Sequence, residues 1–255
     1  MSFLKIDNLS VNYRMRRETV YAVKNINFEV KKGEILGLVG ESGSGKSTLG
    51  NAIINLIDEP GKISNGSVIL DGINIHAKPE DILKLRGKKI GLIFQDPQTS
   101  LNPLLTIGEQ LIETIQTHLN LDFKESKSRA INLLQEVGIK DAENRFDNYP
   151  HQFSGGMRQR VVISLALCCE PELLIADEPT TALDVSIQSQ ILELIKNLTK
   201  ERNLAVILIT HDMGVISETA DRVAVMKNGD LVEIGKTKEI LTKKTASNTK
   251  RRRIF

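Results

Sequence analysis

The stretch that decides the fold is Gly40-Glu41-Ser42-Gly43-Ser44-Gly45-Lys46-Ser47. It fits the pattern G-x-x-x-x-G-K-[ST], in which a tight glycine loop points successive backbone N–H groups at phosphate oxygens. A short apolar run of buried-strand type precedes it at residues 34–39, and a helical pattern follows it at residues 48–57. The order of strand, glycine loop and helix predicts a phosphate site at the N-terminus of a helix.

The residue types in this loop suit ATP with Mg²⁺, and we expect both as cofactors. Lys46 would reach the β- and γ-phosphates, and the Ser47 hydroxyl would ligate the metal, a hard cation that prefers oxygen ligands. The residues that we expect to bind ATP here are Gly40, Glu41, Ser42, Gly43, Ser44, Gly45, Lys46, Ser47 and Thr48.

Two carboxylates, Asp177 and Glu178, end another apolar run, which begins at Leu173. Asp177 is placed to hold Mg²⁺ through its water shell, and Glu178 can accept a proton from an attacking water. Taken alone, such an acidic pair is usually a solvated helix cap. Together with the glycine loop, the pair predicts ATP hydrolysis.

Two further apolar runs end in a polar residue: residues 90–94 precede Gln95, and residues 205–210 precede His211. Ligands of open α/β sheets bind outside the carboxyl ends of the strands, so we expect Gly40, Gln95, Asp177 and His211 to converge on one edge. Gln95 can orient water or metal, and His211 can hydrogen-bond the γ-phosphate or position Glu178. The predicted catalytic residues are Glu178, His211 and Gln95, and the predicted metal ligands are Ser47, Gln95 and Asp177.

A second anion site is predicted where Ser154, Gly155 and Gly156 precede a helical stretch at residues 157–169. With Phe153 before it and Met157 after it, this segment resembles the signature motif of ABC ATPases, usually Leu-Ser-Gly-Gly-Gln. In that family the motif binds the ATP held by the other subunit. The resemblance therefore implies that Ser154, Gly155 and Gly156 bind ATP across a head-to-tail dimer with a second ABC ATPase subunit, in a homodimer or a heterodimer.

The resemblance extends along the chain. Thr181-Ala182-Leu183-Asp184 is similar to the D-loop that lines the dimer seam of the family, and Tyr13 stands where an aromatic residue stacks on adenine. The alternative for Tyr13 is a strand residue that packs on a sheet.

Residues 94–103 and 149–160 resemble the importer ATPases for dipeptides, oligopeptides and nickel in particular. This branch implies two integral membrane permease subunits as partners and, indirectly, an extracytoplasmic substrate-binding protein. It also implies a peripheral location at the cytoplasmic face of the inner membrane. A dipeptide, an oligopeptide and nickel stay open as the transported substrate.

The family implies an α/β P-loop NTPase fold with a RecA-like, mostly parallel sheet core. To this core we add an N-terminal antiparallel β-subdomain, indicated by alternating apolar residues at 3–6, 20–30 and 66–70, and an inserted α-helical subdomain at about 102–155. The ABC ATPase domain is expected at 1–240, and a basic tail at 241–255 is expected to be disordered. A contact of this tail with an anionic membrane surface and a truncation or frameshift remnant stay open as alternatives.

Composition fits a cassette without a membrane span. The chain has 255 residues, of which 40% are hydrophobic, and its longest apolar run, at 161–169, is far shorter than the roughly 20 residues of a spanning helix. A net charge of +2 argues against a nucleic-acid partner. Cys168 and Cys169 are adjacent in an apolar helix and are expected to be reduced packing residues.

Two other functions stay open at this stage. The first is a soluble ABC ATPase switch outside transport, although the translation type carries two cassettes in one chain and the DNA-maintenance type carries a long coiled coil. The second is an inactive importer subunit with a damaged tail. The sequence shows one cassette and no coiled-coil pattern, so we prefer the hypothesis of an importer subunit.

Overall fold

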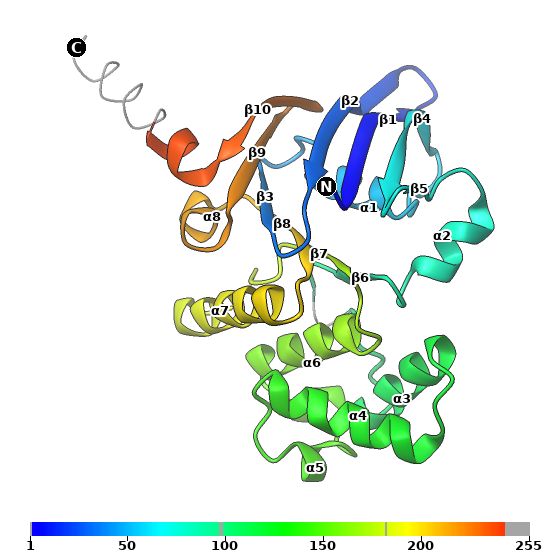
Figure 1. The fold of residues 1–255 in the computed structure, drawn as a ribbon, viewed down its shortest axis with the longest axis vertical. Coiled ribbons are helices and arrows are strands. Elements are labelled where there is room, and N and C mark those ends of the chain that lie inside the picture. Colours follow the sequence, from blue (N-terminus) through cyan, green and yellow to red (C-terminus); the bar gives the residue numbers. More distant parts are fainter. Residues whose placement is uncertain (1, 97–98, 182, 243–255) are drawn as a thin grey trace. The chain divides into compact units, whose positions relative to one another are not determined.

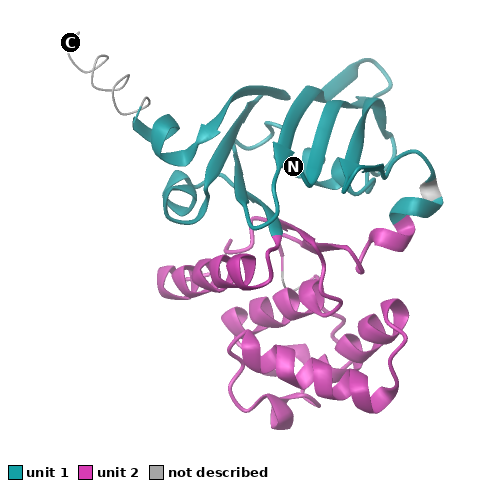
Figure 2. Ribbon diagram, viewed as in Figure 1, with its two compact units in different colours: residues 1–82, 205–255 teal, residues 83–204 magenta. Residues whose placement is uncertain are grey.

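A computed structural model of the chain, shown in Figure 1, describes residues 2–96, 99–181 and 183–242. The chain divides into two compact units, coloured separately in Figure 2. Unit 1 comprises residues 1–82 and 205–255, and unit 2 comprises residues 83–204. A short helix, α2 (Pro79–Leu85), lies where the chain passes from one unit to the other. The predicted tail lies outside the described residues from residue 243 on.

Unit 1 contains an antiparallel sheet with the strand order β2-β1-β4-β5. Its strands are β1 (Leu4–Arg14), β2 (Thr19–Val30), β4 (Gly61–Leu70) and β5 (Ile73–Asn74). The ladder between β1 and β2 shifts register near Asn8 and Asn25, which adopt positive φ angles of 50° and 46°. Asparagine tolerates this left-handed conformation, and the Ser10 hydroxyl accepts the Asn25 backbone N–H there, at 2.9 Å.

The second sheet of unit 1 carries the parallel strands that lead to the predicted site. The strand β3 (Ile35–Val39) pairs in parallel with β8 (Ala205–Thr210) and with β9 (Arg222–Lys227), and β10 (Asp230–Lys236) pairs antiparallel with β9. Every residue of β3 and β8 is buried, as their unbroken apolar runs predict. Two helices pack on these strands, α1 (Lys46–Ile53) and α8 (Met213–Thr219).

Unit 2 holds a short parallel pair of strands and a group of helices. The strands are β6 (Ile90–Ile93) and β7 (Leu173–Asp177), and the helices are α3 (Ile107–His118), α4 (Phe123–Glu136), α5 (Ala142–Arg145), η1 (Pro150–Gln152), α6 (Gly155–Leu167) and α7 (Val185–Glu201). Within the described ranges, none of the helices of either unit combines the length and the apolar character of a bilayer span.

Local capping explains where two helices of unit 2 begin and where one of them ends. Thr106 and Glu109 form a reciprocal capping box at the start of α3, and Asp122 and Glu125 form another at the start of α4. Hydrogen bonds from Thr106 lower the pKa of Glu109. The helix α4 ends in a Schellman motif at Gly138, whose φ is 84°.

Candidate functional site

The glycine loop joins β3 to α1 in unit 1, as predicted. Lys46 is buried, and its Nζ donates to the carbonyl oxygens of Gly40 at 2.9 Å and Glu41 at 3.0 Å, so the ammonium group lies inside the loop. The helix N-cap is Gly45, which has no side chain to bond the first-turn N–H groups. Because those N–H groups have no acceptor within the helix, they are suited to phosphate oxygens.

Close backbone packing explains two of the loop glycines. A Cβ at Gly45 would lie 2.1 Å from the Ala22 carbonyl oxygen, and one at Gly40 would lie 2.3 Å from the Met226 carbonyl oxygen. The turn after β9 also supports the loop, because the Gly229 N–H donates to the Ser44 carbonyl at 3.1 Å. The loop is therefore fixed by the sheets of unit 1 around it.

The remaining predicted ATP ligands of the loop differ in exposure. Glu41, Ser42 and Ser47 are exposed, Thr48 is half-buried and the Ser44 side chain is buried. An exposed hydroxyl at Ser47, in the first turn of α1, can reach a ligand from solvent. Its assignment as a Mg²⁺ ligand stays a prediction.

His211 and Tyr13 also belong to unit 1. His211 follows the last residue of β8 and is exposed, and Asp212 after it caps α8 by accepting the Gly214 N–H at 2.7 Å. Tyr13 is half-buried on β1, where a Cβ at Gly61 would lie 2.6 Å from its ring. This contact fits the alternative of a strand residue that packs on the sheet, and the adenine role stays a prediction.

In unit 2 the structure brings Gln95 and Glu178 together. Gln95 Nε2 donates to Glu178 Oε2 at 3.1 Å, and the Thr181 hydroxyl donates to the same oxygen at 2.9 Å. Glu178 adopts a positive φ of 47°, an uncommon conformation for this residue type. Asp177, the last residue of β7, is half-buried. A carboxylate held by two donors in a turn after a strand is suited to accept a proton from a bound water.

The predicted signature segment begins α6. Ser154 is the N-cap and accepts the Met157 N–H at 3.3 Å. A Cβ at Gly156 would lie 2.7 Å from Ile187 Cγ2 of α7, whereas a Cβ at Gly155 would meet its nearest neighbour, Leu183 Cδ2, only at 3.9 Å. Packing within the described part of the chain therefore explains a glycine at 156 but not at 155.

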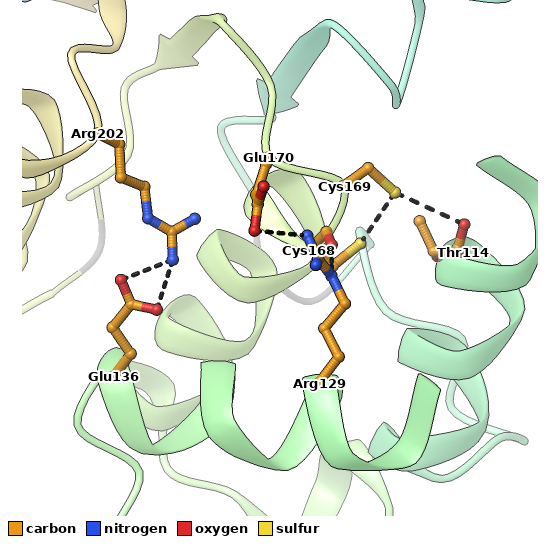
Figure 3. A network of polar contacts seen from close by, with 7 residues as sticks. All are labelled: Thr114, Arg129, Glu136, Cys168, Cys169, Glu170 and Arg202. Atoms are coloured by element: carbon orange, nitrogen blue, oxygen red, sulfur yellow. Dashed lines mark hydrogen bonds and ion pairs between the residues drawn. The ribbon is translucent and has the colours of Figure 1, made fainter. Parts of the chain in front are cut away.

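Arg129 contacts the other end of this helix, as Figure 3 shows. From α4, Arg129 donates to the Cys168 carbonyl at 2.6 Å and pairs with Glu170 at 3.0 Å. Arg202, after α7, donates from its Nη2 to both carboxylate oxygens of Glu136 of α4. These contacts tie α4, α6 and α7 together, so the orientation of the signature segment is set by its own unit.

The two cysteines in the same view are buried free thiols with a sulfur–sulfur distance of 3.7 Å. The hydrogen bond between them and burial raise the pKa of Cys168. Both properties fit the predicted packing role.

Sequence reasoning missed Thr181 as a neighbour of Glu178, because it placed Thr181 at a dimer seam. The signal that could have revealed the contact is the separation of three residues between Glu178 and Thr181, which allows a turn to bring the two side chains together. Ala182 of the same segment lies outside the described residues. The predicted convergence of Gly40, Gln95, Asp177 and His211 involves both units and stays a prediction.

Comparison with known proteins gives the family. Residues 23–181 match the ABC transporter family, and oligopeptide transport ATP-binding protein AppD of Bacillus subtilis (strain 168) is 50% identical over 234 residues. That alignment covers 91% of this chain and 71% of the relative. The chain belongs to the ABC transporter family. Dipeptide transport ATP-binding protein DppD of Escherichia coli (strain K12) is 47% identical to this ABC protein, covering 92% of the chain and 72% of the relative.

Solved ABC cassettes share the fold. The ATP-binding cassette MJ0796, solved as a dimer in a post-hydrolysis state bound to ADP and Pi, is 33% identical with a TM-score of 0.81, and the match covers 92% of this chain and 98% of that one. CbiO1 from Clostridium perfringens, part of an ABC transporter complex, is 32% identical with a TM-score of 0.82, covering 99% and 96%. The family, the branch of these relatives, the fold class and the ATPase role predicted from the motifs are confirmed.

Proposed function

We propose that this chain is the ATP-hydrolysing subunit of an importer for short peptides. The observation that carries the chemistry is the Glu178 carboxylate, held by Gln95 and Thr181 directly after β7. The cargo is inferred from the similarity to oligopeptide and dipeptide transport proteins. Nickel is the other cargo of the importer branch that the sequence resembles, and neither of these two relatives is named for nickel transport.

ATP would be held by the loop of unit 1. The N–H groups of the first turn of α1 and the Lys46 ammonium group attract negative charge and are suited to the phosphates. Tyr13 would stack on the adenine. The oxygens of Ser47, Gln95 and Asp177 are hard donors of the kind that Mg²⁺ prefers, and together they would hold this ion, which when bound would neutralise charge on the phosphates.

Hydrolysis would use side chains of both units. Glu178 accepts the proton of the attacking water, Gln95 orients that water, and His211 donates a hydrogen bond toward the γ-phosphate or positions Glu178. Two donors on Glu178 Oε2 hold the carboxylate in one orientation, which limits the reorganisation needed when the water is activated.

A second ABC ATPase subunit would complete the site. Ser154 is exposed, and a Cβ at Gly155 would meet its nearest neighbour, Leu183 Cδ2, only at 3.9 Å, so a phosphate from another chain could approach the backbone there. The small size of Gly155 is then explained by that approach rather than by packing within the unit. Closure of the dimer on ATP would move two permease subunits, with a binding protein outside delivering the peptide. This chain would lie at the cytoplasmic face of the inner membrane.

The dimer can be tested with the Glu178→Gln protein, which should bind MgATP without turning it over. Its mass is measured by size-exclusion light scattering with and without MgATP. A doubled mass with MgATP supports a site completed by two copies of this chain. A monomer that binds MgATP contradicts self-pairing, and adding candidate second ATPase subunits then tests the heterodimer.

The cargo is tested by uptake. Cells that lack this chain should lose uptake of a labelled di- or oligopeptide and regain it with wild-type protein but not with Glu178→Gln. Unchanged peptide uptake, with loss of ⁶³Ni²⁺ uptake instead, would contradict the peptide assignment.

A further inference from the structure

Thr181, which follows the buried Thr180, contacts Glu178, the candidate catalytic base. Its hydroxyl donates to Glu178 Oε2 at 2.9 Å, and its backbone N–H donates to the Glu178 carbonyl oxygen at 3.1 Å. Thr181 is thus bonded to Glu178 through both its backbone and its side chain. A residue that only supported the turn would need the backbone bond alone.

The backbone explains why these two side chains meet. The positive φ of Glu178, 47°, turns the chain directly after β7, and the N–H of Thr181 closes the turn on the Glu178 carbonyl. The left-handed conformation costs free energy in a residue with a Cβ, so the surrounding contacts must hold it. The Thr181 hydroxyl reaches back across this turn to the carboxylate.

We infer that Thr181 is a positioning residue for Glu178: its hydroxyl fixes the orientation of the carboxylate that accepts the proton of the attacking water. This inference rests on the proposed role of Glu178. Gln95 donates to the same oxygen from another segment, after β6, at 3.1 Å. The two donors come from different segments of the chain and bond the same oxygen, so both restrain the position of Glu178 Oε2.

This link also joins the catalytic turn to the segment that follows it. Asp184, three residues after Thr181, caps α7 by accepting the Ile187 N–H at 3.0 Å. The turn at Glu178 and the start of α7 are therefore separated by a short segment that begins with the positioning hydroxyl.

The test compares three substitutions in the 255-residue chain. Thr181→Val removes the hydroxyl at nearly constant volume, and Thr181→Ser keeps it. Thr114→Val is the matched control, because Thr114 is also half-buried and donates its hydroxyl within unit 2, to the Gln110 carbonyl at 2.8 Å. The kcat and KM for MgATP and the thermal midpoint are measured for each protein.

We expect Thr181→Val to lower kcat about 10- to 100-fold with KM unchanged, the size of effect seen for the hydrogen-bond partners that orient metal-ligating side chains. Thr181→Ser should restore most of kcat, and Thr114→Val should keep it. A kcat of Thr181→Val within about twofold of wild type overturns the inference, and so does a loss that serine fails to restore. If Thr181→Val is too unstable to assay, the serine protein decides alone, because a positioning hydroxyl predicts near-wild-type kcat there.

Glu178→Gln separates the two levels of the account. If Glu178→Gln keeps wild-type turnover, the proposed role of Glu178 itself is wrong. If Glu178→Gln is inactive while Thr181→Val is fully active, the role of Glu178 stands and only the inference about Thr181 fails.

Discussion

Replacing Gly45 by alanine should destabilise the folded chain even without nucleotide. The added Cβ would lie 2.1 Å from the Ala22 carbonyl oxygen, a backbone atom that cannot rotate away, and Gly45 also has a φ of 98°. Gly43 offers the matched control, because its φ is 77° and a Cβ there would meet nothing within 4 Å.

The two substitutions separate conformational strain from steric overlap. A left-handed residue with a Cβ costs roughly 1–2 kcal/mol, which is the whole expected effect of Gly43→Ala. Overpacking that forces backbone shifts costs roughly 1–3 kcal/mol more, so Gly45→Ala should lose about 2–5 kcal/mol. Each kcal/mol lowers the melting temperature of a protein of this size by about 2–4 °C.

The assay is thermal and urea unfolding of both variants in nucleotide-free buffer, where binding cannot contribute. Gly45→Ala should melt clearly below Gly43→Ala, and Gly43→Ala somewhat below wild type. Equal midpoints for the two variants would refute the claim that the Ala22 carbonyl, rather than φ alone, requires glycine at position 45.

Two further predictions concern unit 2. Arg129→Met removes the donor to the Cys168 carbonyl and should lower the free energy of unfolding by about 1–3 kcal/mol in urea titrations. The control, Lys124→Met, changes an exposed residue on the same helix and should stay within about 0.5 kcal/mol of wild type. Equal effects of the two substitutions would contradict the capping role of Arg129. The backbone N–H and the hydroxyl of Thr106 both lower the pKa of Glu109, and Thr106→Val removes only the bond from the hydroxyl. The contribution of that bond is present above the unfolded pKa of Glu109 and is lost as pH falls through the lowered folded pKa. The destabilisation by Thr106→Val should therefore shrink in unfolding curves below about pH 4, and a destabilisation that is independent of pH would contradict the ionic part of the cap.

The sequence predicted the phosphate loop well because its determinants are local. Glycine spacing, an apolar run before it and a helical pattern after it all lie within about 25 residues, and β3, the loop and α1 follow in that order. Bounds were less accurate: the helical pattern at 48–57 corresponds to α1, which begins at Lys46 and ends at Ile53, because Asn55 adopts a positive φ of 55°. A left-handed asparagine gives no clear signal in hydrophobic periodicity.

Contacts between distant segments could not be predicted. The bond between Gln95 and Glu178 spans 83 residues, and that between Arg129 and Cys168 spans 39. Both depend on how helices and strands pack, which no local pattern states. By contrast, the pairing of Thr181 with Glu178 is local but depends on a positive φ at a glutamate, which residue type does not predict.

The most direct test of the account is phosphate release from MgATP by wild-type protein and by Glu178→Gln, with Glu143→Gln, an exposed carboxylate on α5, as control. We expect wild type and Glu143→Gln to hydrolyse ATP equally and Glu178→Gln to be about 10²- to 10⁴-fold slower, while binding of a fluorescent ATP analogue is unchanged. Wild-type turnover in Glu178→Gln would contradict the central claim that this carboxylate is the catalytic base.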